Sequence, residues 1–172
     1  MTTMSVYERM LGYELFEAYP NIYCFTTTRL GGCGEGAYGT FNCSPFCGDD
    51  TNHVLRNQEE LYRHLPQSLH RLMIPFQVHG TEIAWVDRPF TELSEAEQHE
   101  RLHGVDAVIT TEPGCCVCVS TADCVPLLIY DREHQAVAAI HAGWRGTVDR
   151  IVTRTLEAMR DKLGTSGNQV VA

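Results

Sequence analysis

Three side chains that suit a transition metal stand at the ends of short apolar segments. His79 and His141 each close a segment of strand length, and Cys124 lies at a bend between two more. Strand ends project side chains into one rim of a sheet and hold them more rigidly than loops do, so the three are candidates for a shared site, although their spacing does not show that they converge. Two imidazoles and one thiolate suit zinc, and three protein ligands leave a fourth position open, as in catalytic zinc sites. From spacing alone, a buried cysteine and two structural histidines are the alternative.

Charged residues near these segments could support such a site. Asp106 and Asp123 are candidate acid/base groups, or carboxylates that orient a ligating histidine, although aspartate at a strand end also serves turns. Arg29 and Arg145 lie beside glycines, where a guanidinium can reach a phosphate or carboxylate with two hydrogen bonds. A surface salt bridge is the alternative for either arginine.

A second candidate metal motif is the string His99-Glu100-Arg101-Leu102-His103, which matches H-E-x-x-H. Its surroundings are polar on nearly all sides, and Gly104 follows at once. We therefore predict a solvated surface helix rather than a protease-type zinc site.

The other cysteines do not have the spacing of a zinc knuckle. Cys116 and Cys118 share one face of a predicted strand and Cys115 takes the other, so packing is the expected role of all three. Cys33 and its neighbours Cys43 and Cys47 form no Cys-x-x-Cys pair.

Hydrophobic patterning indicates an α/β or α+β fold. Apolar and β-branched runs predict strands over 22–29, 73–79, 82–86, 106–110, 115–120, 125–130 and 136–141. Helical periodicity predicts helices over 50–65, 91–103 and 147–163, the last capped by Thr147 and stopped by Gly164. The near-continuous apolar strands imply central strands that are buried on both sides by helices.

Composition limits the class of partner. The 172 residues suit one compact domain over 1–172, and 13 basic against 22 acidic side chains give a net charge of −9. That balance argues against nucleic-acid polymers and anionic membranes, which require a basic face. We find no export signal and no membrane-length apolar run, so we predict a cytoplasmic protein with reduced thiols; its oligomeric state is unknown.

Several motifs occur in a characteristic order. They are Thr28-Arg29-Leu30-Gly31-Gly32, Phe41-Asn42, Gln77-Val78-His79-Gly80, Asp106-Ala107-Val108-Ile109-Thr110, Thr121-Ala122-Asp123-Cys124-Val125-Pro126 and His141-Ala142-Gly143-Trp144-Arg145-Gly146. Together they resemble the laccase-domain family, also called YfiH-type, multicopper polyphenol oxidase-like or peptidoglycan editing factor. The resemblance runs from about Tyr23 to the last residue.

The resemblance implies a mixed β-sheet flanked by helices and a metal site of His79, Cys124 and His141. The metal would be Zn²⁺, with copper as the other possibility. The implied substrates are small purine nucleosides and phosphate: phosphorolysis of adenosine, inosine and S-methyl-5'-thioadenosine to base and ribose 1-phosphate, and deamination of adenosine. Family members continue past Ala172, so the chain is expected to hold the N-terminal and central part of the domain.

Other residues of these motifs receive roles through the resemblance and our hypotheses. Asp123 and Arg145 join the three ligands as catalytic candidates, and the substrate-binding candidates are Arg29, Asn42, Gln77 and Trp144. The two arginines would hold phosphate, and Trp144 or Tyr38 would stack on the base.

Three alternatives stay open. Cys124 could be a nucleophile with His141 as its base and Asp123 or Asp106 orienting that base. A truncated, inactive paralogue could serve as a binding module. The oxidase chemistry of the family's other name is disfavoured, because none of the eight histidines forms a His-x-His unit.

Overall fold

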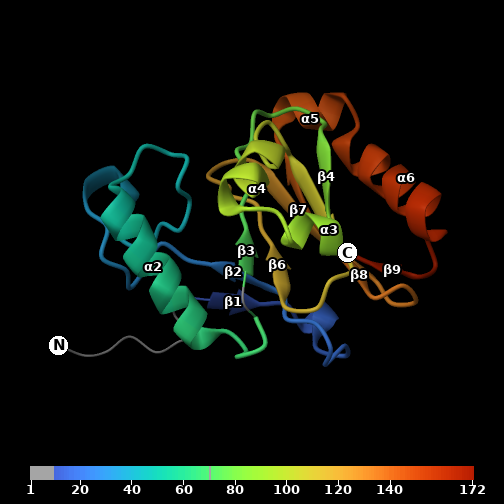
Figure 1. Ribbon diagram of the computed structural model, residues 1–172, viewed down its shortest axis with the longest axis horizontal. Helices are drawn as coiled ribbons and strands as arrows, with labels where there is room; N and C mark the ends of the chain where they lie inside the picture. Colours follow the sequence, from blue (N-terminus) through green and yellow to red (C-terminus); the bar gives the residue numbers. More distant parts are fainter. Residues whose placement is uncertain (1–9, 70) are drawn as a thin grey trace. The chain divides into compact units, whose positions relative to one another are not determined.

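The computed structural model describes residues 10–69 and 71–172, and the chain divides into two compact units, Met1–Gln67 and Ser68–Ala172. Figure 1 shows the elements of both units. We describe each unit by itself.

The first unit contains a small antiparallel sheet and one long helix. Strands β1 (Met10–Gly12) and β2 (Phe25–Thr27) pair, so the predicted strand over 22–29 is confirmed only in its centre. A 3₁₀ turn follows each strand. Turn η1 (Glu14–Phe16) follows β1, and turn η2 (Gly36–Tyr38) follows β2. Helix α2 spans Thr51–His64, as predicted.

Helix α2 organises the glycine-rich segment of this unit. The Asp50 carboxylate accepts hydrogen bonds from the first backbone N–H groups, which fixes the helix start. The buried Asn57 side chain bonds to the backbone of Cys33, Thr40 and Asn42. A Cβ at Gly32 would lie 2.2 Å from the Thr40 carbonyl oxygen, so only glycine allows this close approach.

The second unit is built around a five-stranded mixed sheet in the order β4-β5-β8-β7-β9. Strands β4 and β5 are parallel, and the remaining pairs are antiparallel. A separate parallel pair joins β3 and β6. The strands are β3 (Arg71–Met73), β4 (Ile83–Val86), β5 (Ala107–Thr110), β6 (Cys115–Val117), β7 (Val125–Asp131), β8 (Ala136–Ala142) and β9 (Val170–Val171).

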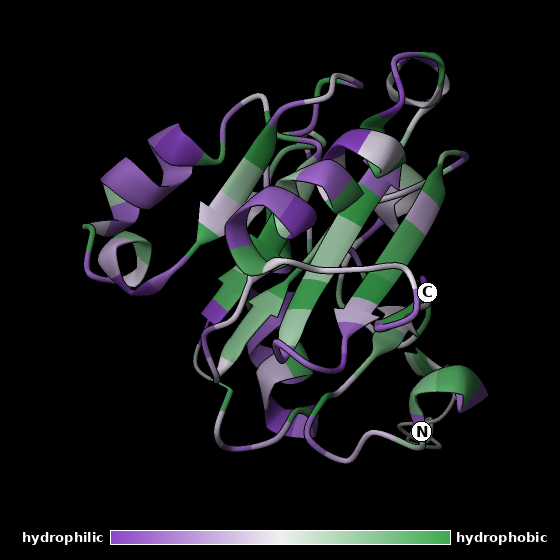
Figure 2. Cartoon of the chain, turned by 90° about the vertical axis from the view of Figure 1, so that its right-hand side faces the viewer, coloured by the Kyte–Doolittle hydropathy of each residue, from purple (hydrophilic) through white to green (hydrophobic). Residues whose placement is uncertain are grey.

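Both faces of the sheet are covered, which confirms the predicted α/β class. On one face, Ile151 and Met159 of helix α6 (Ile151–Leu163) pack on Ile109 and Ile140. On the other, Phe90 of helix α3 (Arg88–Thr91) belongs to a second apolar cluster with residues of β4 and β5. Every residue of β5 is buried, and Figure 2 shows the strands of the sheet coloured largely as hydrophobic.

Two predicted helices are each divided in the structure. Of the prediction over 91–103, only α4 (Glu95–Arg101), capped by Ser94, is a helix of its own, and Thr91 is the last residue of the separate helix α3, capped by Asp87. The prediction over 147–163 becomes α5 (Trp144–Val148) and α6. Thr147 was wrongly predicted as the cap, since it lies inside α5 and Arg150, with a left-handed φ of 64°, precedes α6. Gly164 ends α6 at a φ of 83°, as predicted.

The prediction of a strand over 73–79 is also wrong for most of its length. Strand β3 ends at Met73, and beyond it Phe76 makes a single bridge to His103. The segment from Gln77 to Gly80 is irregular because its backbone is held by a side chain, as described below. Within residues 10–69 and 71–172, no helix has the length and apolar character needed to cross a bilayer.

We predict that Ile140→Ala lowers the free energy of unfolding by about 3 kcal/mol. Ile140 is fully buried in the cluster between the sheet and α6, so truncation leaves a cavity. Urea denaturation followed by circular dichroism measures the change. Val148→Ala, at a highly exposed position, is the control and should stay within about 0.5 kcal/mol of the parent. Equal stability of the two variants would contradict this placement of the core.

Candidate metal centre

His79, Cys124 and His141 converge in the second unit. One ligand atom from each lies within 4.8 Å of the other two, and this trio is the only such group of potential ligands among the residues described. His141 is buried, Cys124 is half-buried and His79 is exposed, so the trio has one side open to solvent. The convergence that strand-end positions suggested is therefore present.

The separations suit a tetrahedral metal ion. The Cys124 Sγ lies 3.6 Å from His79 Nε2, and the two imidazole rings meet edge to face with centroids 4.8 Å apart. Zinc bonds of about 2.3 Å to sulfur and about 2.0 Å to nitrogen place two tetrahedral ligands about 3.6 Å apart. The separation between Cys124 and His79 thus matches that of two zinc ligands, and the ligand atom of His141 lies within 4.8 Å of both.

The Asp106 carboxylate positions two of the three ligands. Its oxygens accept backbone N–H bonds from Val78, His79 and Gly80 at 3.3, 3.0 and 2.8 Å, and its Oδ1 lies 2.7 Å from His141 Nδ1. Because a carboxylate accepts this bond, Nδ1 of His141 carries the proton and Nε2 is free to bind a metal. Asp106 is fully buried, so these four bonds also satisfy its charge.

The backbone at His79 takes a conformation that the sequence pattern did not indicate. Its φ is 61°, in the left-handed region that is uncommon for non-glycine residues. The bonds from three successive N–H groups to one carboxylate hold this turn in place. The predicted strand is interrupted here because the Asp106 carboxylate, rather than a neighbouring strand, accepts those bonds.

Gly143 is a feature of the site that sequence reasoning missed. A Cβ at this position would lie 2.5 Å from His79 Cδ2 and 3.3 Å from both Cys124 Sγ and His141 Cε1. Any side chain here would force His79 to move and would crowd Cys124 and His141. The glycine between His141 and Trp144 in the family-like motif was the available signal, and its steric reason appears only in three dimensions.

The surroundings of Cys124 disfavour a free thiolate. Partial desolvation raises the pKa of the Cys124 thiol, and the neighbouring Asp123 carboxylate raises it further. The backbone N–H of Trp144 donates to Cys124 and acts in the opposite direction, as one of the smaller effects. Without a cation the thiol is protonated near neutral pH, whereas a bound metal ion would favour the thiolate.

Gln77 connects the two segments that carry His79 and Cys124. Its side-chain amide donates to the Ser120 carbonyl at 2.8 Å and accepts from the Ser120 N–H at 2.7 Å. Both polar ends of the amide are therefore engaged with backbone. The geometry makes Gln77 a brace within the unit, and its assignment to substrate binding stays a prediction.

Trp144 and Arg145 lie at the start of α5, directly after Gly143. The Trp144 side chain is 71% exposed, which excludes a core role, and the Arg145 guanidinium lies 5.5 Å from the centre of its ring. No ion pair of Arg145 occurs among the residues that the structure describes. The exposed indole of Trp144 and the guanidinium of Arg145 therefore follow His141 closely in the sequence, and the guanidinium is not held by an ion pair with any described residue.

The two candidates of the first unit bind within their own unit. Arg29 donates to the carbonyls of Ala37 and Gly39, and Asn42 bonds to Ser44, Cys47 and Asp49. Tyr38 donates its hydroxyl hydrogen to the Cys47 carbonyl. Their predicted roles at the substrate remain predictions.

The H-E-x-x-H string does not form a metal site. Helix α4 ends at Arg101, His99 and His103 are both exposed, and the His103 ring stacks on Phe76 at 4.5 Å between centroids. The predicted surface helix is confirmed for residues 95–101. All eight cysteines are free thiols in the structure.

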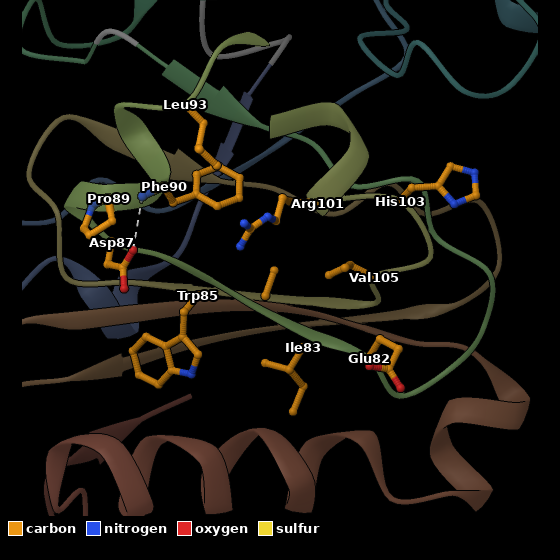
Figure 3. A pocket seen from close by; sticks show the side chains of 11 residues that line it. Glu82, Ile83, Trp85, Asp87, Pro89, Phe90, Leu93, Arg101, His103 and Val105 are labelled. Atoms are coloured by element: carbon orange, nitrogen blue, oxygen red, sulfur yellow. Dashed lines mark hydrogen bonds between the residues drawn. The ribbon is translucent and has the colours of Figure 1, made fainter. Parts of the chain in front are cut away.

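A groove of about 610 Å³ lies along β4 (Figure 3). Ile83 and Trp85 of β4 line it from one side, and Phe90 and Leu93 lie opposite. Lys162 of α6 lies 4.3 Å from the centre of the Trp85 ring. None of the candidate site residues lines this groove, so we do not assign it as the functional site on the basis of its size.

The fold and the site define the class of protein. It is a mixed α/β scaffold with a candidate metal site, in which the buried Asp106 carboxylate holds His141, one of the three potential ligands. Comparison with known proteins then identifies the family. The family described as multi-copper polyphenol oxidoreductase laccase matches residues 23–172, and the chain belongs to it.

Curated relatives carry names from nucleoside metabolism. The chain is 51% identical over 172 residues to a purine nucleoside phosphorylase of Bacteroides thetaiotaomicron, covering 100% of this chain and 64% of that protein. It is 40% identical over 146 residues to adenosine deaminase RL5 of an unknown prokaryotic organism, covering 85% of this chain and 56% of that protein. The chain thus spans about half to two thirds of the length of these relatives.

Solved structures share the fold. YlmD from Geobacillus stearothermophilus has a TM-score of 0.74 at 29% identity, over 84% of this chain and 53% of that one. Bacillus licheniformis YfiH has a TM-score of 0.83 at 24% identity, over 95% of this chain and 60% of that one, and supports the fold alone.

We predict that Asp106→Asn weakens metal binding by about 10- to 100-fold. The amide keeps the size of the side chain, but its NH₂ group cannot accept the bonds that one carboxylate oxygen now receives. Competition with a chromophoric chelator measures the affinity. Asp149→Asn, an exposed aspartate at the end of α5, is the matched control and should bind like the parent. Equal affinities for all three proteins would remove Asp106 from the site.

Proposed function

We propose that His79, Cys124 and His141 hold a zinc ion and that this chain carries the site of a purine nucleoside enzyme. The reactions proposed are phosphorolysis of adenosine, inosine and S-methyl-5'-thioadenosine, and deamination of adenosine. The observation that carries the proposal is the convergence of three ligand atoms within 4.8 Å beside the Asp106 carboxylate. The names of the curated relatives support the substrate class.

Zinc is the proposed metal because of the donor set. Imidazole and thiolate are both zinc ligands, and three protein ligands with an open fourth position are the pattern of catalytic zinc sites, whose known sets include Cys₂His and His₃. Copper in oxidases of the laccase type requires many more histidines, and the sequence contains no His-x-His unit. We therefore do not propose oxidase chemistry despite the family's name.

When bound, zinc supplies Lewis-acid chemistry and lowers the pKa of a coordinated water. The chain's own residues then have distinct tasks. Asp106 keeps His141 in one tautomer and prevents its rotation. Asp123 is exposed beside Cys124 and can exchange a proton with solvent or with a leaving purine base. The open side next to His79 admits the substrate.

Substrate binding is proposed for Trp144 and Arg145. The exposed indole offers a face on which a purine can stack, and the neighbouring guanidinium offers paired donors for phosphate. A nucleoside is uncharged, so the acidic chain does not repel it. Phosphate is an anion in a protein with a net charge of −9, and a local cation is therefore needed.

The alternative in which Cys124 is a nucleophile is less well supported. Its Sγ lies 3.6 Å from Nε2 of His79, whereas this mechanism needs a hydrogen bond to the proposed base His141. The raised pKa of the thiol also opposes formation of the thiolate. A cysteine hydrolase would withstand chelators, and a non-catalytic binding module would show no turnover with or without metal.

The proposal is tested by metal analysis together with a nucleoside assay. We expect about one zinc ion per chain, and phosphate-dependent release of base from adenosine or inosine by chromatography. His79→Ala should lose most of the zinc and the activity, because it removes one of the three ligands. His99→Ala, an exposed histidine on α4, is the matched control and should keep both.

Several outcomes decide against the proposal. Zinc that persists in His79→Ala would overturn the site assignment. Activity that survives complete chelation, but is lost to iodoacetamide, would favour the cysteine hydrolase. Bound zinc without turnover of any nucleoside would favour the binding module.

We further predict that Arg145→Ala raises the KM for phosphate by about 10- to 100-fold, the effect of losing a charged hydrogen-bonding partner. The KM for the nucleoside should change much less. Steady-state kinetics at varied phosphate measure the change. Arg160→Ala, an exposed arginine on α6, is the control. An unchanged phosphate KM in Arg145→Ala would exclude this arginine from phosphate binding.

A further inference from the structure

A second group of reactive side chains lies on β6, outside the metal centre. Cys116 lies in β6 and Cys118 directly follows its last residue, so the predicted strand over 115–120 is confirmed only over 115–117. The sulfur atoms of the two cysteines are 3.7 Å apart, on one side of the chain as predicted. The Cys118 thiol donates to Cys116 Sγ and lies 3.4 Å from the Cys116 carbonyl oxygen. Cys115 points the other way and packs against the apolar cluster beneath α3. The two thiols therefore form a pair from which Cys115 is excluded.

The backbone holds the two cysteines differently. Cys116 pairs with Leu72 in the β3–β6 ladder, whereas Cys118 follows the last residue of β6 and is tied to β3 by its N–H bond to the Met73 carbonyl. Cys116 thus lies within the ladder, and Cys118 lies just beyond its end. Both side chains are only half-buried, so a small oxidant can reach them.

The pair is chemically biased toward one nucleophile. The hydrogen bond from Cys118 lowers the pKa of the Cys116 thiol, and burial opposes this only in part. A cysteine with a lowered thiol pKa and a second thiol beside it is the arrangement of an attacking cysteine and a resolving cysteine.

A metal-binding role for the pair is less well supported. Thiolate sites for zinc require a third and fourth ligand. Among residues 10–69 and 71–172, His79, Cys124 and His141 are the only three potential ligands that cluster, so no third ligand joins Cys116 and Cys118.

We propose that Cys116 and Cys118 form a reversible disulfide when the protein meets a peroxide. The Cys116 thiolate attacks one peroxide oxygen, the O–O bond breaks, and a sulfenic acid and hydroxide form. The Cys118 sulfur then attacks the Cys116 sulfur and displaces water. The sum is two thiols and one hydrogen peroxide to one disulfide and two waters, so the sulfurs are oxidised and the peroxide is reduced.

The disulfide would act on the metal centre through a short path. A sulfur–sulfur bond of about 2.05 Å brings the two atoms about 1.6 Å closer than they are now. Ser120 follows Cys118 by two residues, and its backbone is bonded twice to Gln77, two residues before His79. Cys124 lies on the same segment after Ser120. Closure of the disulfide therefore strains the brace between two ligands, and we expect weaker metal binding.

This second step rests on the metal site proposed above, whereas the disulfide does not, and the test separates them. The metal-loaded protein is treated with hydrogen peroxide, digested and analysed by mass spectrometry. We expect the loss of two hydrogen atoms from the peptide that contains Cys116 and Cys118, reversed by a dithiol reductant. Cys118→Ser should abolish this loss, and Cys115→Ser, the matched control on the opposite strand face, should retain it.

A chelator competition on the same samples measures metal affinity. We expect a loss of about tenfold or more in the oxidised parent and Cys115→Ser, and no loss in Cys118→Ser. A disulfide that persists in Cys118→Ser, or overoxidation of Cys116 without a disulfide, overturns the proposal. A disulfide that forms without any change in affinity refutes the coupling alone. Failure of the parent to bind metal before oxidation refutes the proposed function and leaves the disulfide result standing.

Discussion

The buried carboxylate of Asp106 is the interaction on which the site depends. A buried charge is costly unless hydrogen bonds satisfy it, and here three backbone N–H groups and one imidazole do so. The same four bonds keep His79 in a left-handed turn and hold His141 in one tautomer. Satisfying one charge therefore orients two of the three ligands, and the apolar sheet around Asp106 makes those bonds strong.

The sheet register brings the pieces together. Strands β5 and β8 are antiparallel, with Ala107 opposite Ile140, so Asp106 and His141 meet at one end of that ladder. Strands β7 and β8 pair Pro126 with His141, which brings Cys124 to the same end. Cores on both faces of the sheet fix these registers, because a slip by one residue would exchange the buried and exposed faces. The apolar core thus determines the geometry of the polar site.

The electrostatics around Cys124 oppose a free thiolate. Desolvation and the nearby carboxylates of Asp123 and Asp106 raise the pKa of the Cys124 thiol. A positive charge beside the sulfur would lower that pKa. A divalent ion supplies that charge, and Gly143 leaves the space for three side chains to meet. The pair of Cys116 and Cys118 differs, since a hydrogen bond joins its two thiols. Among the described residues, no third potential metal ligand clusters with them. Two kinds of cysteine chemistry can therefore coexist on one segment.

The sequence by itself determined the class of fold, helix α2 and the buried central strands, and it singled out His79, Cys124 and His141 as candidate ligands, because periodicity, caps and strand-end positions are local signals. Only the tertiary structure decided that the ligands converge, that the chain leaves the strand at His79 and that the last predicted helix breaks at Arg150. It also showed Gln77 as a brace and Gly143 as the space between the ligands. These depend on contacts between residues far apart in the chain, such as Asp106 with the backbone of Val78–Gly80, and no local pattern encodes such contacts.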